Sequence, residues 1–200
     1  MPTSIYHIRK TSLGLKRKYR ISADDGSGKP GKSLGYAEKQ LKVSDELDIY
    51  GDEGRSEKLV TVRESSKGWL AALTGYEAFD HEGRLLGSFG VLPKKSVDRT
   101  TWEFEQPGLG RLTGTERSVA TARARRLLTL LDAVGEIAGA LVKYHFDFVR
   151  EGFGREGELV FSIDKPKVFD DWYRLTVHVD AVDRQLLFAL AVTMEARQRG

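Results

Sequence analysis

Short runs of alternating apolar and polar residues, separated by turn residues, fill most of the first half of the chain. The alternation is clear in Leu59–Arg63 and in Trp102–Glu105. Because successive side chains of a strand point to opposite faces, such runs predict half-buried strands. Asp80–Gly83 has apolar residues on both sides and predicts a hairpin turn. The strands predicted in this half are 47–50, 59–63, 69–73, 76–79 and 85–91.

The pattern changes after residue 114 and returns to alternation near residue 144. Between them, Ala124, Leu127, Leu128 and Leu131 recur at the spacing of one helical face. Alanine, leucine and arginine, which dominate this segment, all favour helix, so one helix is predicted near 115–131. Further strands are predicted at 144–149, 159–163 and 172–179.

The last segment decides the predicted architecture. From Leu186 to Met194 no polar face is visible for more than two turns, and a helix that is apolar all round requires burial all round. Asp183 is a suitable N-cap. A helix of about 16 residues is roughly 24 Å long, close to the depth of a barrel. Since side chains alone do not fill a wide barrel, we expect a closed antiparallel β-barrel around a central, buried C-terminal helix, Asp183–Arg199.

This order of elements resembles the tubby C-terminal-like superfamily, which includes tubby domains, phospholipid scramblases and LURF-one-related proteins. The resemblance covers about residues 19–199, and it depends on the hairpin Gly75–Gly87 and on the terminal run Asp183–Val192. It implies a barrel of about twelve strands. It also implies a binding role, in the better-known members through phosphoinositides or lipid surfaces. Neither the scramblases' acidic calcium loop nor their cysteine-rich palmitoylation segment is recognisable, and no tubby lipid-binding motif transfers residue by residue.

Composition narrows the expected chemistry. The chain has no cysteine, which excludes disulfides, thiolate metal sites and a cysteine nucleophile. The start has no apolar signal region, and the longest apolar runs fall far short of the roughly 20 residues of a spanning helix. We therefore expect a cytoplasmic protein without a transmembrane segment, membrane-peripheral at most.

Positive charge is concentrated at the N-terminal end. Residues 1–20 hold six of the 32 Lys and Arg residues and none of the 29 Asp and Glu residues. This asymmetry predicts a basic N-terminal arm, 1–18, followed by one barrel domain, 19–200. The candidate ligand-binding residues are Lys16, Arg17, Lys18 and Arg20.

Three roles fit these cations. They suit anionic phospholipid, and they also suit nucleic-acid phosphates. Alternatively, they guard an edge strand against aggregation. The predicted function is a non-enzymatic binding module for anionic lipid or a protein partner, and the alternative is a nucleic-acid-associated or regulatory protein.

No pattern in the sequence indicates catalysis, a cofactor or a metal. The four histidines, His7, His81, His145 and His178, lie outside known hydrolase motifs and are expected at the surface. Gly26–Ser33 matches the spacing of a phosphate-binding loop. However, its flanks are not those of a buried strand and a helix, so the segment is interpreted as a hairpin. The adjacent acidic pairs Asp24-Asp25 and Asp170-Asp171 are interpreted as turns.

Overall fold

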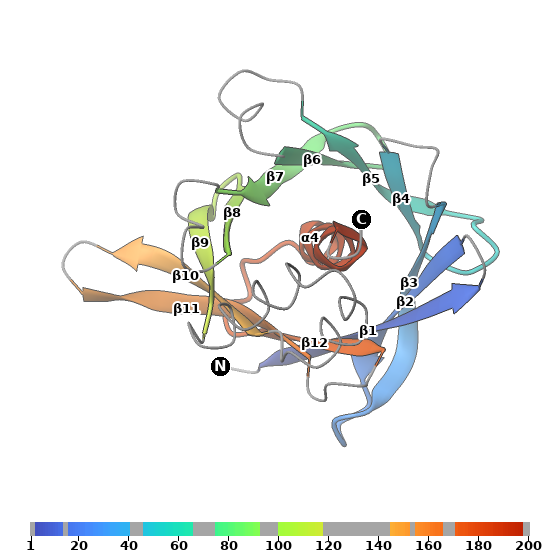
Figure 1. Cartoon of the computed structure of the whole chain (residues 1–200), viewed down its shortest axis with the longest axis horizontal. Coiled ribbons are helices and arrows are strands. Elements are labelled where there is room, and N and C mark those ends of the chain that lie inside the picture. Colours follow the sequence, from blue (N-terminus) through green and yellow to red (C-terminus); the bar gives the residue numbers. More distant parts are fainter. Residues whose placement is uncertain are drawn as a thin grey trace, which may run out of the picture.

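The computed structural model of the 200-residue chain describes residues 3–13, 16–40, 46–65, 75–92, 100–117, 145–152, 155–165 and 171–197. These residues form twelve strands and one long helix (Figure 1). The strands are β1 (Ser4–Leu13), β2 (Lys16–Asp24), β3 (Pro30–Gln40), β4 (Glu46–Tyr50), β5 (Lys58–Glu64), β6 (Gly75–Asp80), β7 (Leu85–Val91), β8 (Thr101–Gln106), β9 (Gly110–Glu116), β10 (His145–Gly152), β11 (Arg155–Asp164) and β12 (Trp172–Val177). The helix is α4 (Arg184–Arg197).

The strands form one closed antiparallel barrel in which neighbours in the sequence are neighbours in the sheet. Closure comes from β12, which pairs with β1 in the register Ile8↔Tyr173. A closed sheet has no unpaired edge, so every described strand has a partner on both sides. This confirms the predicted fold class.

The N-terminal end belongs to this barrel. Strand β1 lies between β12 and β2, and β2 contains the basic residues 16–20. The structure therefore places residues 4–13 and 16–18 in the barrel wall, which differs from the predicted boundary between an arm and a domain at residue 18. The apolar positions Ile8 and Ile21 are fully buried, and burying them requires these two strands in the sheet.

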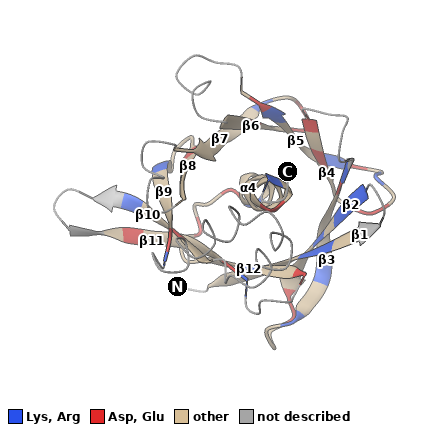
Figure 2. Cartoon of the chain, in the orientation of Figure 1, with Lys and Arg blue, Asp and Glu red and all other residues tan. Residues whose placement is uncertain are grey.

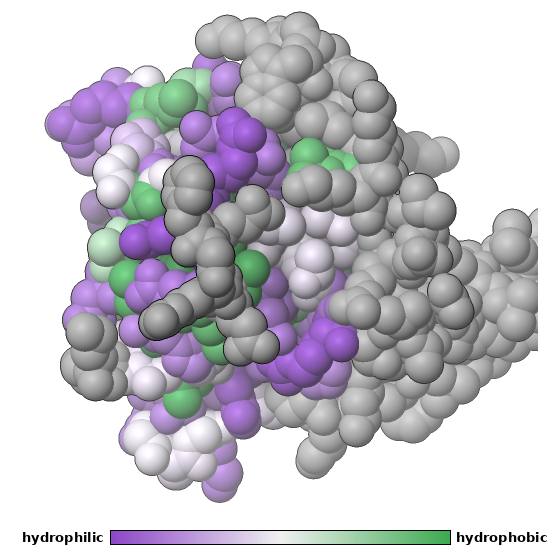
Figure 3. Space-filling model, turned by 90° about the vertical axis from the view of Figure 1, so that its left-hand side faces the viewer, coloured by the Kyte–Doolittle hydropathy of each residue, from purple (hydrophilic) through white to green (hydrophobic). Residues whose placement is uncertain are grey.

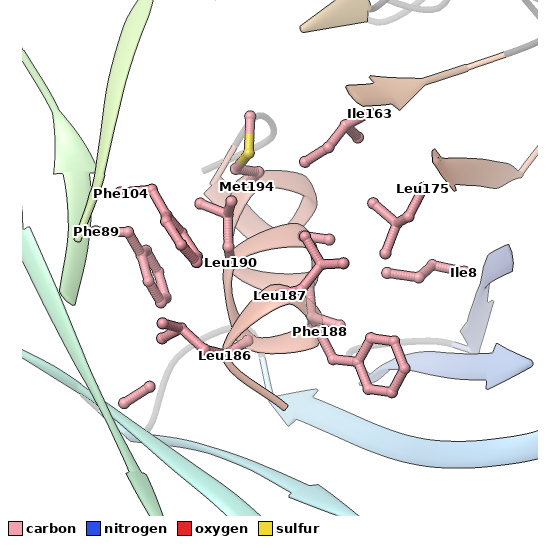
Figure 4. Packing of buried hydrophobic residues seen from close by; sticks show 14 of the residues in the cluster. Ile8, Phe89, Phe104, Ile163, Leu175, Leu186, Leu187, Phe188, Leu190 and Met194 are labelled. Carbon is pink, nitrogen blue, oxygen red and sulfur yellow. The ribbon is translucent and has the colours of Figure 1, made fainter. Parts of the chain in front are cut away.

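Helix α4 lies along the axis of the barrel (Figure 1), and every residue from Leu186 to Ala196 is buried. Asp183 caps it as predicted, because its Oδ1 accepts a hydrogen bond of 2.8 Å from the backbone N–H of Leu186. Figure 4 shows Leu190 and Leu187 pointing toward different sides of the wall. The predicted central helix is thus confirmed, and its side chains pack into the same core as those of the wall.

The wall contributes aromatic and aliphatic side chains to this core. In Figure 4, Phe89 and Phe104 lie on one side of the helix, and Ile163, Leu175 and Ile8 lie on the other. All five are buried. Each such side chain stabilises the fold by about 1.5–3 kcal/mol relative to exposure.

The hairpin predicted at Asp80–Gly83 joins β6 to β7. The Asp80 carboxylate accepts hydrogen bonds of 2.9 Å from the backbone N–H groups of Glu82 and Arg84. Gly83 has a φ of 80°, a conformation that favours glycine. The turn chemistry therefore agrees with the prediction.

Two predicted elements fall on residues that the structure does not describe. The strand 69–73 lies wholly outside the described residues, and so does most of the helix near 115–131. Thr115 and Glu116, with which that helix was to begin, are instead the last residues of β9. They pair with Asp147 and Phe146 of β10.

The outside of the barrel is largely polar where it is described. Figure 3 shows hydrophilic residues interspersed with small hydrophobic groups on the face to the left of Figure 1. Leu85 and Leu159 are the large hydrophobic residues that stand exposed in the described part of the chain. No helix within the described residues is long and apolar enough to cross a membrane.

Candidate functional site

Strand β2 separates the four predicted binding residues between two faces. Alternation directs Tyr19 and Ile21 into the core, where both are fully buried. Lys16, Lys18 and Arg20 lie on the opposite, outer face. Three of the four predicted cations therefore share one surface.

Arg17 points inward instead. Its Nη1 donates a hydrogen bond of 3.3 Å to the backbone carbonyl of Ala196, near the end of α4. The last carbonyls of a helix lack partners within the helix and carry partial negative charge, so a guanidinium stabilises them. The structure thus places Arg17 at the helix end and away from the outer face that carries the other three residues.

Two carboxylates lie among the outer cations, and each contacts two of them. Glu38 of β3 lies 3.0 Å from Lys16 and 2.7 Å from Arg55, which follows β4. Glu53 lies 3.6 Å from Lys18 and 2.7 Å from Arg20. Each carboxylate is therefore shared between two positive charges.

These contacts shift the acidity of both carboxylates. The hydrogen bond from Lys16, with further ones from Arg55 and Tyr36, lowers the pKa of Glu38 to about 2 although partial burial opposes this. The hydrogen bond from Arg20 lowers the pKa of Glu53. Both carboxylates are thus held in the charged form at neutral pH.

Arg9 of β1 extends this surface, because it is exposed and pairs in register with Arg20. We call the whole surface the basic face. It consists of Arg9, Lys16, Lys18, Arg20, Arg55, Glu38 and Glu53. Figure 2 shows Lys and Arg on β2 and the strands beside it, on the right-hand side of the barrel. Five cations and two anions give the basic face an excess of positive charge.

Sequence reasoning missed Arg9 as a member of this face, and it missed Arg55, Glu38 and Glu53. Arg55 and Glu53 lie in the loop after β4, and Glu53 is 33 residues from its partner Arg20 in the sequence. Their position next to β2 follows from the register of β2, β3 and β4. The sequence shows which residues alternate outward, but it does not give this register.

The histidines are not all at the surface as predicted. His81 is exposed, and His145 and His178 are partly exposed. His7 is 1% exposed, and its Nε2 lies 2.7 Å from Oδ2 of Asp24. The prediction is wrong for His7, because its outer side lies against Trp172, with 5.1 Å between ring centroids.

Another outer cluster contains Ser, His and Asp in an order unsuited to nucleophilic catalysis. His145 Nδ1 lies 2.5 Å from Oδ1 of Asp164, and Ser162 donates to Oδ2 of the same carboxylate at 3.4 Å. A Ser–His–Asp triad requires the imidazole between hydroxyl and carboxylate, so that it can take the hydroxyl proton. Here the carboxylate lies in the middle. No group of three or more metal-binding side chains occurs in the part of the chain that is described.

The segment Gly26–Ser33 is part of the hairpin between β2 and β3, as predicted. Its backbone N–H groups are already bound within the turn. Asp24 Oδ1 accepts from Gly26 at 2.7 Å, and Asp25 Oδ1 accepts from Ser27 at 2.8 Å. A phosphate-binding loop instead leaves such groups free for its ligand at the start of a helix.

Comparison with protein families, with curated proteins and with solved structures found no match to this chain.

Proposed function

We propose that the chain is a non-enzymatic binding module that attaches to anionic phospholipid through the basic face. The observation that supports this most directly is the excess of positive charge on the basic face, where four cations share two carboxylates and Arg9 adds a fifth cation. An anionic lipid surface would supply the missing negative charge. Each basic residue near such a surface contributes about 1 kcal/mol.

The position of α4 inside the barrel is a reason to propose a binding site on the outer surface. Helix α4 lies inside the barrel with its side chains buried from Leu186 to Ala196, which favours the outer side of the wall as the place where a large ligand binds. Four of the five cations project from the paired strands β1 and β2, which fix the position of their backbone and so reduce the entropy lost on binding. The proposed module is cytoplasmic and membrane-peripheral, since the cytoplasmic leaflet carries the anionic lipids.

The architecture supports assigning the chain to the tubby-like superfamily, as part of the same proposal. A closed barrel of twelve described strands around a C-terminal helix is the arrangement that the resemblance implies. Binding roles at lipid surfaces are what the resemblance suggests for function. A protein partner with an acidic surface would bind to the same cations of the basic face.

The experiment that tests this is cosedimentation with liposomes of graded anionic lipid content. The test variant changes Lys16, Lys18 and Arg20 to Gln and keeps Arg17, because Arg17 contacts the helix. The matched control changes Arg63, Arg84 and Arg111, which are exposed elsewhere on the barrel. Both variants lose three positive charges.

The wild-type protein and the control variant are expected to bind more as the anionic fraction rises. The test variant is expected to bind roughly 100-fold more weakly, from three lost contributions of about 1 kcal/mol each. Equal losses of liposome binding in both variants would show that binding depends only on net charge. That result would contradict a specific role of the basic face. Tighter binding to duplex DNA than to liposomes at matched salt would favour the nucleic-acid alternative.

A further inference from the structure

Two arginines lie directly opposite each other on the basic face. Strand pairing places Arg9 of β1 beside Arg20 of β2, and residues in such positions have Cβ atoms about 5 Å apart. Like charges at this separation destabilise the sheet unless an anion lies near both. Lys18 precedes Arg20 by two residues on β2, and it therefore projects from the same side of the strand. The three side chains gather positive charge at one point of the basic face.

One carboxylate occupies part of this cluster. Oε2 of Glu53 lies 2.7 Å from Nη2 of Arg20, and Oε1 of Glu53 lies 3.6 Å from Nζ of Lys18. The two oxygens of one carboxylate thus contact two different cations. Arg9 forms no ion pair within 4.0 Å with another described residue. Glu53 therefore balances only part of the positive charge of the three cations.

Glu53 reaches the cluster from a turn that is closed by its own backbone hydrogen bonds. The turn follows β4, and the N–H of Gly51 donates to the carbonyl of Glu57 at 2.9 Å. The N–H of Arg55 donates to the carbonyl of Asp52 at 3.2 Å. Neither bond involves the side chain of Glu53. A change of side-chain rotamer can therefore move this carboxylate away from the cations while the backbone of the turn stays in place.

The contacts of Glu53 are exposed, and a ligand can reach them from solvent. The side chains of Arg20, Glu53 and Lys18 are 60%, 48% and 32% exposed. Ion pairs in such positions are screened by water and salt and contribute little to stability. The hydrogen bond from Arg20 lowers the pKa of Glu53, so the carboxylate is charged at neutral pH. Glu53 is thus a charged group that is held weakly over accessible cations.

Glu38, the other carboxylate of the basic face, is held more firmly. Its side chain is 9% exposed and contacts Lys16 and Arg55. The hydroxyl of Tyr36 donates a further hydrogen bond to it, at 3.0 Å. A ligand that replaced Glu38 would have to break all three contacts and reach a nearly buried group. Glu38 therefore belongs to the fixed part of the basic face, whereas Glu53 can be replaced.

We propose that Glu53 marks a lipid-phosphate site, in which the phosphate replaces its carboxylate between Lys18 and Arg20 and is also bound by Arg9. Phosphate oxygens accept charge-assisted hydrogen bonds from guanidinium and ammonium groups as carboxylate oxygens do. The inference rests on the proposed function, because anionic lipid supplies the phosphate. It adds that the free protein occupies its own site and that Glu53 limits binding to membranes with enough anionic lipid to displace it.

The attachment of Glu53 to the same chain determines which anions can displace it. An intramolecular group has a high effective concentration at its site, so a dilute anion in solution competes poorly with it. An anionic membrane presents many phosphates within a small volume and competes well. Removal of the Glu53 carboxylate should therefore lower the fraction of anionic lipid that binding requires.

The test compares Glu53→Gln with Glu105→Gln in binding to vesicles of phosphatidylserine and phosphatidylcholine. Glu105 is a matched control, because it is 45% exposed and contacts Arg111 at 3.2 Å. Both substitutions remove one negative charge from an exposed ion pair. Glu53→Gln is expected to bind about two- to fivefold more tightly than the wild type, the factor by which an exposed pair competes with a ligand. Glu105→Gln, on β8, is expected to bind as the wild type does.

A second background separates displacement of Glu53 from a simple gain of local charge. When Lys18 and Arg20 are both changed to Gln, Glu53 has no cation pair to occupy. Glu53→Gln should then strengthen vesicle binding no more than Glu105→Gln does in the same background. A gain that persists there would assign the effect to local charge and overturn the proposal.

The remaining outcomes distinguish this inference from the proposed function. Wild-type binding that equals the binding of Glu53→Gln would overturn the inference and leave the proposed function standing. No vesicle binding by either protein would overturn both. Inorganic phosphate, added at the phosphate concentration of the vesicles, is expected to leave wild-type binding unchanged. Inhibition by inorganic phosphate would make free phosphate the ligand and overturn the assignment to lipid.

Discussion

Lys10 and Glu195, which are 185 residues apart in the sequence, form a buried ion pair with 3.0 Å between Nζ and Oε1. Their side chains are 6% and 3% exposed. Tyr173 donates a hydrogen bond to the other oxygen, Oε2, of Glu195. These contacts join the first strand, the last strand and the central helix near the end of α4.

Replacing Lys10 with Met is expected to destabilise the protein by about 3–5 kcal/mol, because it leaves Glu195 buried without its counter-ion. Replacing both residues with Met should restore much of the loss, since no uncompensated charge remains. Urea unfolding measures both changes. Arg20→Gln, which affects a pair exposed on both sides, is the control and should cost less than about 1 kcal/mol. A loss no larger in Lys10→Met than in this control would contradict a buried pair.

The Lys10–Glu195 contact illustrates what the sequence can and cannot predict. The apolar run Leu186–Met194 predicts a buried helix, and the Asp183 cap predicts where it starts, because both signals are local. Glu195 is the one acidic residue in this helix, yet nothing local identifies its partner. Lys10 points inward because Tyr6 and Ile8 do, and the pairing follows only from closure of β12 on β1.

The candidate site likewise combines features that local sequence signals predict with contacts that depend on strand pairing. Its cations are visible as a cluster in the sequence, and strand alternation is enough to separate Arg17 from Lys16 and Lys18 once β2 is known to be a strand. The counter-ions Glu38 and Glu53 depend on neighbouring strands and turns. Long-range register determines these contacts, and a single sequence does not encode it in any short pattern.

Close packing of the helix against the wall requires glycine at position 87. A Cβ atom there would overlap the backbone oxygen of Glu105 and Cδ2 of Leu186. Gly87→Ala is therefore expected to destabilise the protein by at least about 1–3 kcal/mol, the usual cost of overpacking. Thermal unfolding measures this loss. An unchanged Tm would show that α4 and β8 lie farther from β7 than the structure places them.

Arg17→Gln separates helix capping from surface binding. Loss of the hydrogen bond to the Ala196 carbonyl is expected to reduce stability by about 1 kcal/mol. Liposome binding should remain close to wild type, because Arg17 lies on the inner side of β2. Chemical unfolding and cosedimentation on the same preparation check both results. A large loss of binding at unchanged stability would place Arg17 on the outer face instead.

Glu38 makes the folding stability of the protein depend on pH in the acidic range. Its folded-state pKa of about 2 lies below the ordinary value of 4.5. A depressed carboxyl pKa contributes stability that is complete above pH 4.5 and is lost as the pH falls toward 2. Glu38→Gln should therefore lower stability at neutral pH and flatten its decline between about pH 4.5 and 2. Urea unfolding at a series of pH values measures the decline, and parallel curves for both proteins would contradict the assignment.

The central claim is that α4 is buried inside the barrel, which leaves the outer wall as the place for binding. Leu190 is fully buried in the middle of this helix. The most direct test is the unfolding free energy of Leu190→Asp beside Leu190→Met. The account predicts that the Asp variant does not fold, because an unpaired charge is buried. It predicts a cost below about 1.5 kcal/mol for the Met variant. A folded Asp variant of near wild-type stability would contradict the claim.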